Sequence, residues 1–161
     1  MIALRPLRPS DIPVIKAWPP YPPDFSLLDY SLRDGGWLEE YSREDGADIL
    51  VAETGSEIVG FSILSRKNEK NAEFRIALHP HRLGQGLGKT IALLTLDYGF
   101  SDPVLATICL IVRKNNPRAE RLYESLQFRH CGECTEPVHG EPVQFRQMEI
   151  DRITFEGVKR S

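Results

Sequence analysis

The stretch RLGQGLGKT at residues 82–90 constrains the fold more than any other part of the chain. It follows an apolar, β-rich segment at 73–78 and precedes a segment from Leu87 to Tyr98 whose apolar residues recur at helical spacing. A strand, a glycine-rich turn and a helix in this order can bind anions, because glycines let the backbone approach a ligand and the helix N-terminus presents free amides. A glycine-rich turn without a ligand is the alternative interpretation.

The glycine spacing matches neither of two nucleotide-binding patterns. The phosphate-loop pattern G-x-x-x-x-G-K-[ST] ends like Gly88-Lys89-Thr90, but Leu83 takes the place of its first glycine. The dinucleotide pattern G-x-G-x-x-G fails because Gly88 follows Gly86 one residue too early. The loop therefore has to be interpreted together with its surroundings.

Size and composition predict one ordinary globular domain in a reduced compartment. The chain has 161 residues, of which 41% are hydrophobic and 27% charged. Three cysteines are too few, and odd in number, for a disulfide scaffold. There is no apolar leader and no run of membrane-spanning length, so we expect a cytoplasmic protein without a membrane partner.

Charge is distributed unevenly along the chain. The net charge of −3 argues against a general nucleic-acid binder, which needs a basic surface. Residues 24–53 are strongly acidic, whereas residues 66–89 and 113–129 are rich in lysine and arginine. The first region suits a cationic partner and the other two suit an anionic one, with solvated surface charge as the alternative.

Residue periodicity predicts a mixed α/β order of elements. Strands are expected at 2–5, 49–53, 57–65, 73–78, 107–112, 127–131 and 143–150, and helices at 11–18, 25–33, 36–44, from 87 and from 117. Ser10 and Asp11 are predicted to cap the first helix, and residues 132–142 to form a loop. Seven of the twelve prolines lie within residues 6–23, and their last stretch, PPYPP at 19–23, predicts a stiff loop.

Two segments in order resemble the GNAT superfamily of acyl-CoA-dependent N-acetyltransferases. The first is Leu78-His79-Pro80 followed by Gly84-Gln85-Gly86-Leu87-Gly88-Lys89. The second has the form L-x-V-x-x-x-N-x-x-A-x-x-L-Y-E-S-L-x-F and runs from Leu110 to Phe128. Two residues depart from the family pattern: Leu83 stands where Arg or Gln is usual, and Gln127 stands where glycine is usual.

The resemblance implies a central mixed, mostly antiparallel sheet of six to seven strands flanked by about four helices. It implies a single domain over residues 1–161, with a variable acceptor-side portion at 1–47 and an acetyl-CoA-binding core at 48–150.

The resemblance also assigns roles in binding acetyl-CoA as cosubstrate. The amides of Gly84, Gln85, Gly86, Leu87, Gly88 and Lys89 would hold the pyrophosphate. The backbone of Ile76, Ala77 and Leu78 would pair with the pantetheine arm, and an N–H of that strand would stabilise the oxyanion. Asn116 would bond the arm near the thiol.

The same resemblance names candidate catalytic residues. Tyr123 matches the family's general acid, which protonates the departing thiolate, although a buried helix residue without a role is the alternative. Glu73 is a candidate base, directly or through water, against the alternative of an exposed edge charge. His79 is a further candidate base.

The closest likeness is to the branch of spermidine/spermine and ribosomal-protein N-terminal acetyltransferases. That branch implies a primary amine as acceptor: a polyamine, a small cationic amine or a protein N-terminus. The sequence does not set the oligomeric state, and a homodimer is one option that the branch offers. A non-catalytic acyl-CoA sensor and a phosphate-loop NTPase are the alternative functions.

A metal site is not expected. Cys131 and Cys134, with His130 and His139 nearby, contain zinc-type ligands, but their spacing matches no established finger. A cysteine nucleophile lacks a paired His and acid pattern.

Overall fold

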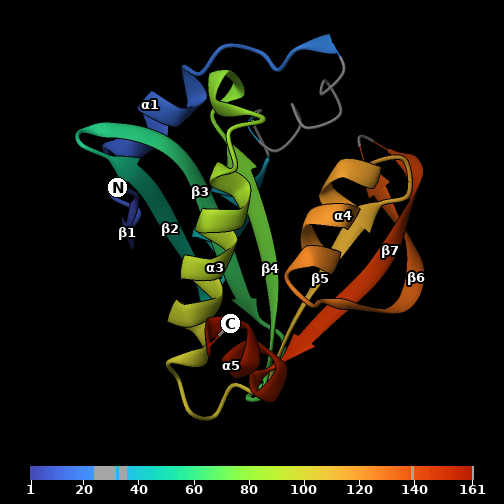
Figure 1. The fold of residues 1–161 in the computed structure, drawn as a ribbon. Coiled ribbons are helices and arrows are strands. Elements are labelled where there is room, and N and C mark those ends of the chain that lie inside the picture. Colours follow the sequence, from blue (N-terminus) through green and yellow to red (C-terminus); the bar gives the residue numbers. More distant parts are fainter. Residues whose placement is uncertain (24–31, 33–35, 139, 161) are drawn as a thin grey trace. The chain divides into compact units, whose positions relative to one another are not determined.

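The computed structural model describes residues 1–23, 32, 36–138 and 140–160. Its strands form one seven-stranded sheet in the order β1-β2-β3-β4-β5-β7-β6 (Figure 1). The predicted mixed fold class is confirmed, with five α-helices in the described residues where about four were expected. The helix predicted at 25–33 lies outside the described residues except for Leu32.

The elements, in chain order, are β1 (Ala3–Pro6), α1 (Asp11–Lys16), α2 (Trp37–Ser42), β2 (Ala47–Thr54), β3 (Glu57–Arg66), β4 (Asn71–Leu78), the 3-10 helix η2 (Pro80–Arg82), α3 (Leu87–Phe100), β5 (Thr107–Arg113), α4 (Pro117–Ser125), β6 (Arg129–Val138), β7 (Glu141–Asp151) and α5 (Arg152–Arg160).

The chain divides into two compact units. The first unit comprises Met1–Ser65 and Arg75–Thr95, and the second comprises Arg66–Phe74 and Leu96–Ser161. Strand β4 and helix α3 each contribute residues to both. The expectation of one domain with portions at 1–47 and 48–150 stays a prediction.

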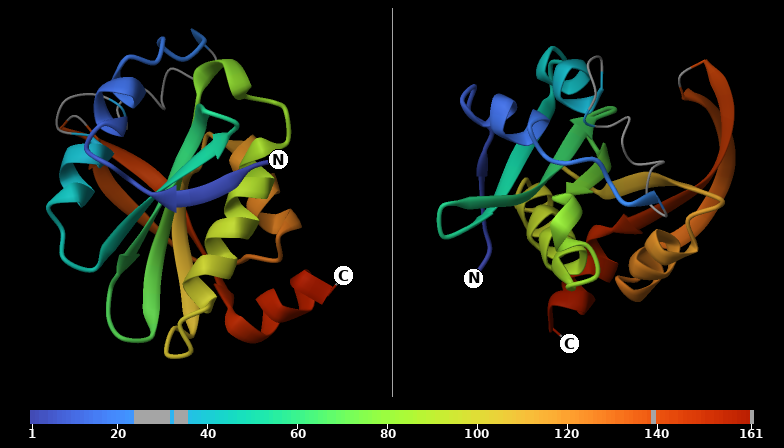
Figure 2. Two further views of the ribbon diagram at one scale, coloured as in Figure 1. Left: turned by 90° about the vertical axis from the view of Figure 1, so that its left-hand side faces the viewer. Right: turned by 90° about the horizontal axis from the view of Figure 1, so that it is seen from above.

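The first unit is built on three antiparallel strands. β1 pairs with β2, and β2 pairs with β3 around a turn in which Gly55 has a φ of +61°, a conformation that suits glycine (Figure 2). Val51, Phe61 and Ile63 of these strands are fully buried. Ile15 of α1 and Leu38 of α2 pack into the same core, which shows why the short helices have apolar residues on one side.

The prediction that Ser10 and Asp11 cap α1 is wrong, because neither side chain makes a capping hydrogen bond to the helix. Ser10 occupies the N-cap with α-helical backbone angles and makes no side-chain cap bond. The Asp11 carboxylate instead accepts two bonds from Arg5, at 2.8 and 2.9 Å, and one from the Arg8 amide at 2.7 Å. The hydrogen bonds from Arg5 hold the pKa of Asp11 below its usual value. Asp11 therefore ties α1 to strand β1.

The second unit is built on β5, which pairs in parallel with β4 and antiparallel with β7. Ile108, Leu110 and Met148 are almost completely buried on these strands.

The prediction of a loop at 132–142 is wrong, because most of that segment belongs to the long β6–β7 hairpin (Figure 2). Pro137 and Pro142 of this segment stand opposite each other next to the turn. There they interrupt the hydrogen-bond ladder only at its end.

Helix α5 was not predicted from the sequence. Asp151 caps it by accepting a bond from the Thr154 amide at 2.8 Å, and Phe155 is buried against Phe100 with ring centroids 5.4 Å apart. The Asp-x-x-Thr cap before an amphipathic segment was the available signal.

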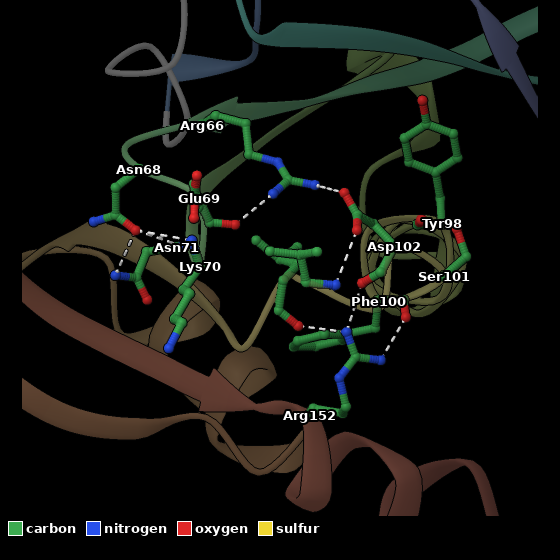
Figure 3. Close-up of polar contacts among 12 residues, drawn as sticks. Arg66, Asn68, Glu69, Lys70, Asn71, Tyr98, Phe100, Ser101, Asp102 and Arg152 are labelled. Atoms are coloured by element: carbon green, nitrogen blue, oxygen red, sulfur yellow. Dashed lines mark hydrogen bonds and ion pairs between the residues drawn. The ribbon is translucent and has the colours of Figure 1, made fainter.

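The guanidinium of Arg152, at the start of α5, reaches the segment that leaves α3 (Figure 3). It donates to the carbonyls of Phe100 and Asp102, both at 2.6 Å, and to that of Leu105. The Asp102 carboxylate in turn pairs with Arg66.

No helix in the described part of the chain is both long and apolar enough to cross a bilayer.

Candidate active site

The glycine-rich loop lies in the first unit, between η2 and α3. Gly84 and Gly86 both have a φ of +78°, a conformation that costs other residues about 1–2 kcal/mol, which explains the glycines. Within the described residues, no amide from Gly84 to Lys89 donates to another carbonyl of a turn or cap. The first turn of α3 leaves its amides without helical acceptors, so the loop presents a row of free N–H groups suited to an anion.

The basic residues of this loop differ in their surroundings. The Arg82 guanidinium forms an ion pair with Glu57, which offsets part of its charge. Lys89 is exposed in the first turn of α3. Lys89 is therefore the cation of the loop that can move to meet a phosphate.

The C-terminal half of β4, which carries Ile76, Ala77 and Leu78, is held against β3. The His79 amide donates to the Val59 carbonyl at 2.9 Å. Gly60 of β3 allows a close approach: a Cβ added there would lie 2.9 Å from the Ala77 carbonyl oxygen and 3.0 Å from the Ile91 side chain. The backbone assigned to the pantetheine arm thus depends on a glycine in the neighbouring strand.

Replacing Gly60 by alanine is expected to lower the free energy of unfolding by about 2 kcal/mol, because overpacking typically costs that much and the nearest atom is backbone. Chemical denaturation measures the change. Gly157→Ala is the matched control, since a Cβ at this site in α5 would meet nothing within 4 Å. There we expect a gain of about 0.5–1 kcal/mol from helix propensity. A Gly60→Ala variant as stable as the control would contradict the close approach.

His79 follows β4 and is partly buried. Its Nδ1 accepts a bond from the His81 amide at 3.0 Å, and its ring lies 5.0 Å from that of Trp18. Burial, together with the neighbouring His81, lowers the pKa of His79, so its ring is neutral near pH 7. A neutral imidazole can accept a proton, and His79 remains a candidate base.

Tyr123 lies in the second unit, where the C-terminus of α4 fixes its backbone. The amides of Leu126 and Phe128 donate to the Tyr123 carbonyl at 3.1 and 3.0 Å, and the Gln127 amide donates to the Glu124 carbonyl at 3.0 Å. With Gln127 at a φ of +74°, these bonds form a Schellman cap. A glycine is usual at such a position, which explains why the family has one where this chain has Gln127.

The ring of Tyr123 is packed edge-on between two phenylalanines. Its centroid lies 6.2 Å from that of Phe74 and 5.7 Å from that of Phe128, and the residue is 7% exposed. Burial raises the pKa of Tyr123, because the phenolate would lose its hydration. The hydroxyl therefore stays protonated at neutral pH, which is the form that a general acid requires.

Replacing Gln127 by glycine is expected to raise the free energy of unfolding by about 1 kcal/mol, because the left-handed conformation is costly for a side chain with a Cβ. Gly55→Ala is the reverse control: Gly55 has a φ of +61° and open space around it, so only its backbone conformation is tested. Thermal or denaturant unfolding should move in opposite directions for the two variants. A loss of stability in Gln127→Gly would contradict the cap.

Glu73 and Asn116 are also placed in the second unit. The Glu73 carboxylate lies 3.6 Å from Lys67 and is 14% exposed, and its residue stands opposite Cys109 in the β4–β5 register. The Asn116 side-chain oxygen accepts a bond from the Ala119 amide at 3.2 Å and so caps α4. Only the amide nitrogen of Asn116 is then left to donate to a ligand.

The cysteines lie on strands of the second unit. Cys109 is in β5, and Cys131 and Cys134 are in β6, as free thiols whose pKa values are raised by burial. Among the described residues, no group of three or more His, Cys, Asp and Glu side chains is arranged to hold a metal. His139 lies outside the described residues.

Sequence reasoning missed one hydrogen bond at the end of β4. The hydroxyl of Tyr21, in the PPYPP segment, donates to the Leu78 carbonyl at 2.6 Å. The PPYPP pattern predicts a stiff loop, and it carries no signal for a contact with a residue 57 positions later. The only available signal was an aromatic residue set among four prolines, which is unusual for a loop without a packing role.

The chain is similar to proteins of one acetyltransferase family. The model of the "Acetyltransferase (GNAT) family" matches residues 14–128. Spermidine N(1)-acetyltransferase of Escherichia coli K12 is 30% identical over 146 residues, which cover 82% of this chain and 75% of the relative. The enzyme of the same name from Vibrio cholerae is 33% identical over 106 residues, which cover 63% of this chain and 61% of the relative.

Solved structures share the fold along nearly the whole chain. A chimera of the Vibrio cholerae spermidine N-acetyltransferase SpeG with hSSAT has a TM-score of 0.78 and 25% identity, covering 97% of this chain and 98% of that one. The Vibrio cholerae spermidine N-acetyltransferase in complex with CoA and spermine has a TM-score of 0.74 and 24% identity, covering 96% and 98%. The resemblance to the spermidine branch and the expected enzyme class are confirmed: the chain belongs to the GNAT family of acetyltransferases and is an acyltransferase.

Proposed function

We propose that this chain transfers the acetyl group of acetyl-CoA to a primary amine of a polyamine, with spermidine as the first candidate. The observation that carries the proposal is the 30% identity, over 82% of the chain, to a spermidine N(1)-acetyltransferase. A small cationic amine and a protein N-terminus are the other primary amines that the family resemblance offers as acceptors.

The residues of the first unit fit the anionic part of the cosubstrate. The free amides from Gly84 to Lys89, two glycines with positive φ and the exposed Lys89 are the donors that a pyrophosphate needs. The backbone of Ile76–Leu78 would pair with the pantetheine arm. Asn116 would add a donor through its amide nitrogen, since its oxygen caps α4.

When bound, acetyl-CoA supplies the thioester that the amine attacks. A carbon–nitrogen bond forms to the acetyl carbon, and the carbon–sulfur bond breaks. A backbone N–H at the end of β4 would stabilise the negative charge that develops on the carbonyl oxygen. Tyr123 would give its proton to the departing sulfur and regain one from solvent. The proton of the amine would pass to Glu73, directly or through water, or to His79.

Acidic residues between positions 24 and 53 support a cationic substrate. Of those in the described part of residues 24–53, Glu39 pairs with Lys16, Glu44 accepts a bond from Ser65 and Glu53 pairs with Arg5. Glu40, Asp45 and Asp48 are exposed. These three carboxylates leave negative charge at the surface, which attracts a polycation over distances of about 8–10 Å at physiological salt.

The decisive experiment measures thiol release from acetyl-CoA in the presence of polyamines, amino acids, aminoglycosides and N-terminal peptides. We expect spermidine or spermine to give the highest kcat/KM. A peptide or aminoglycoside as the best acceptor would retain acetyl transfer and replace the polyamine. Stabilisation of the fold by acetyl-CoA with no thiol release from any amine would favour the non-catalytic sensor instead.

A further inference from the structure

The proline-rich segment delivers a tyrosine to the end of β4. Tyr21 is 5% exposed, and its hydroxyl donates to the Leu78 carbonyl at 2.6 Å. Pro19 and Pro20 precede it and Pro22 and Pro23 follow it, so four fixed φ angles limit how the backbone around the tyrosine can move. The segment therefore holds the tyrosine in place at little entropic cost on folding.

The Leu78–His79 peptide group is held at both ends. Its carbonyl accepts from Tyr21, and its N–H, which belongs to His79, donates to the Val59 carbonyl at 2.9 Å. The indole of Trp18 adds a contact from the same N-terminal segment, 5.0 Å from the His79 ring. Both attachments come from a part of the chain about sixty residues earlier, and both act where β4 ends.

The bond from Tyr21 lies on the edge of β4 that faces away from β3. Successive residues of a strand direct their backbone groups to opposite edges, and the N–H of His79 faces β3. The backbone groups of Leu78 and Ile76 therefore face the other edge. The hydroxyl of Tyr21 donates to the Leu78 carbonyl on this edge, and the pairing of β4 with β5 covers only Asn71–Glu73. The Leu78 N–H is therefore the group on this edge that can donate to a ligand.

We propose that Tyr21 is a positioning residue for acetyl transfer, holding the Leu78 carbonyl so that the Leu78 N–H is aimed at the thioester carbonyl. The inference rests on the proposed function, because it assigns Leu78 as the backbone donor of that reaction. Tyr21 itself forms no bond to the reacting atoms. Its hydroxyl acts through the backbone that it fixes, and donors held in advance are worth more than donors that must be ordered during the reaction.

The test is Tyr21→Phe, which removes one hydroxyl and keeps the ring and its burial. We expect kcat to fall about tenfold and the KM for acetyl-CoA to change less than about threefold, because orientation of a donor matters most in the transition state. In the CoA-bound protein, hydrogen exchange at the Leu78 amide should become faster in the variant. Tyr98→Phe, the same change at a tyrosine of α3 that is 44% exposed, should alter neither quantity.

Each outcome decides the inference. A purely structural role would lower the stability of the variant and leave kcat per folded molecule unchanged, and that result would overturn the proposal. A rise in KM with unchanged kcat would also overturn it, because Tyr21 would then be a binding contact. If the wild-type protein acetylated no amine, the proposed function would fail by itself. The exchange rate of the Leu78 amide in the CoA-bound protein would then decide whether Tyr21 positions this backbone.

Discussion

Replacing Tyr123 by phenylalanine is expected to lower kcat for acetyl transfer about 100-fold and to leave the KM for acetyl-CoA within about twofold, because a general acid acts only in the transition state. The variant loses the proton that would neutralise the departing thiolate. It keeps the ring contacts with Phe74 and Phe128, which hold the side chain in place. The change removes one hydroxyl and leaves the buried ring in place, so we expect little change in stability.

The pH profile separates an acid from a residue that only packs. Burial raises the pKa of Tyr123, so its proton is retained through neutral pH and is lost only above the ordinary pKa of tyrosine, about 10. Wild-type kcat should therefore show no fall from this group below that pH. Steady-state kinetics with spermidine from pH 6 to 10, beside isothermal titration with CoA, measure turnover and binding separately. A Tyr123→Phe variant with kcat within about twofold of the wild type at every pH would refute the role of general acid.

Most of the fold and the identity of the family could be predicted from the sequence because both depend on local patterns. Each of these patterns predicts one local structure: the glycine loop predicts a turn, Asn116-Pro117 predicts a helix start, and the apolar segment at 107–112 predicts a buried strand. The family comparison confirms the likeness that these motifs suggested. The roles of Glu73, Tyr123 and the loop amides stay predictions, since the structure places these residues without a ligand.

Features that depend on contacts between distant residues could not be predicted. The bond from Tyr21 to Leu78 spans 57 positions, and a proline-rich segment gives no sign of where its tyrosine points. The β6–β7 hairpin extends through residues 132–142, where a loop is predicted, and the opposite placement of its prolines is visible only in the register. Helix α5 begins with a readable cap at Asp151, but its stability comes from Phe155 and Arg152, which pack on α3 residues about fifty positions earlier.

Replacing Arg152 by alanine is expected to lower the free energy of unfolding by about 3 kcal/mol, because hydrogen bonds from charged groups contribute about 1.5–3 kcal/mol each and here the donors are half-exposed. The guanidinium donates to the carbonyls of Phe100, Asp102 and Leu105, and it lies 5.3 Å from the centroid of the Phe100 ring (Figure 3). These carbonyls end α3 and form the turn toward β5. Without Arg152 they would depend on water at a place where α5 covers them.

Two further variants show which property of Arg152 matters. Arg152→Lys keeps the charge but lacks the planar fork that reaches three carbonyls, so we expect about half of the loss seen with alanine. Arg160→Ala removes an exposed arginine from the other end of α5 and should leave the unfolding transition unchanged. Denaturant unfolding gives the free energies, and the alanine variant should melt about 10 °C lower than the wild type. Equal stability of the lysine variant and the wild type would mean that charge alone is required. Equal stability of the alanine variant and the wild type would mean that the three carbonyls are satisfied by solvent and that Arg152 does not fix the end of α3.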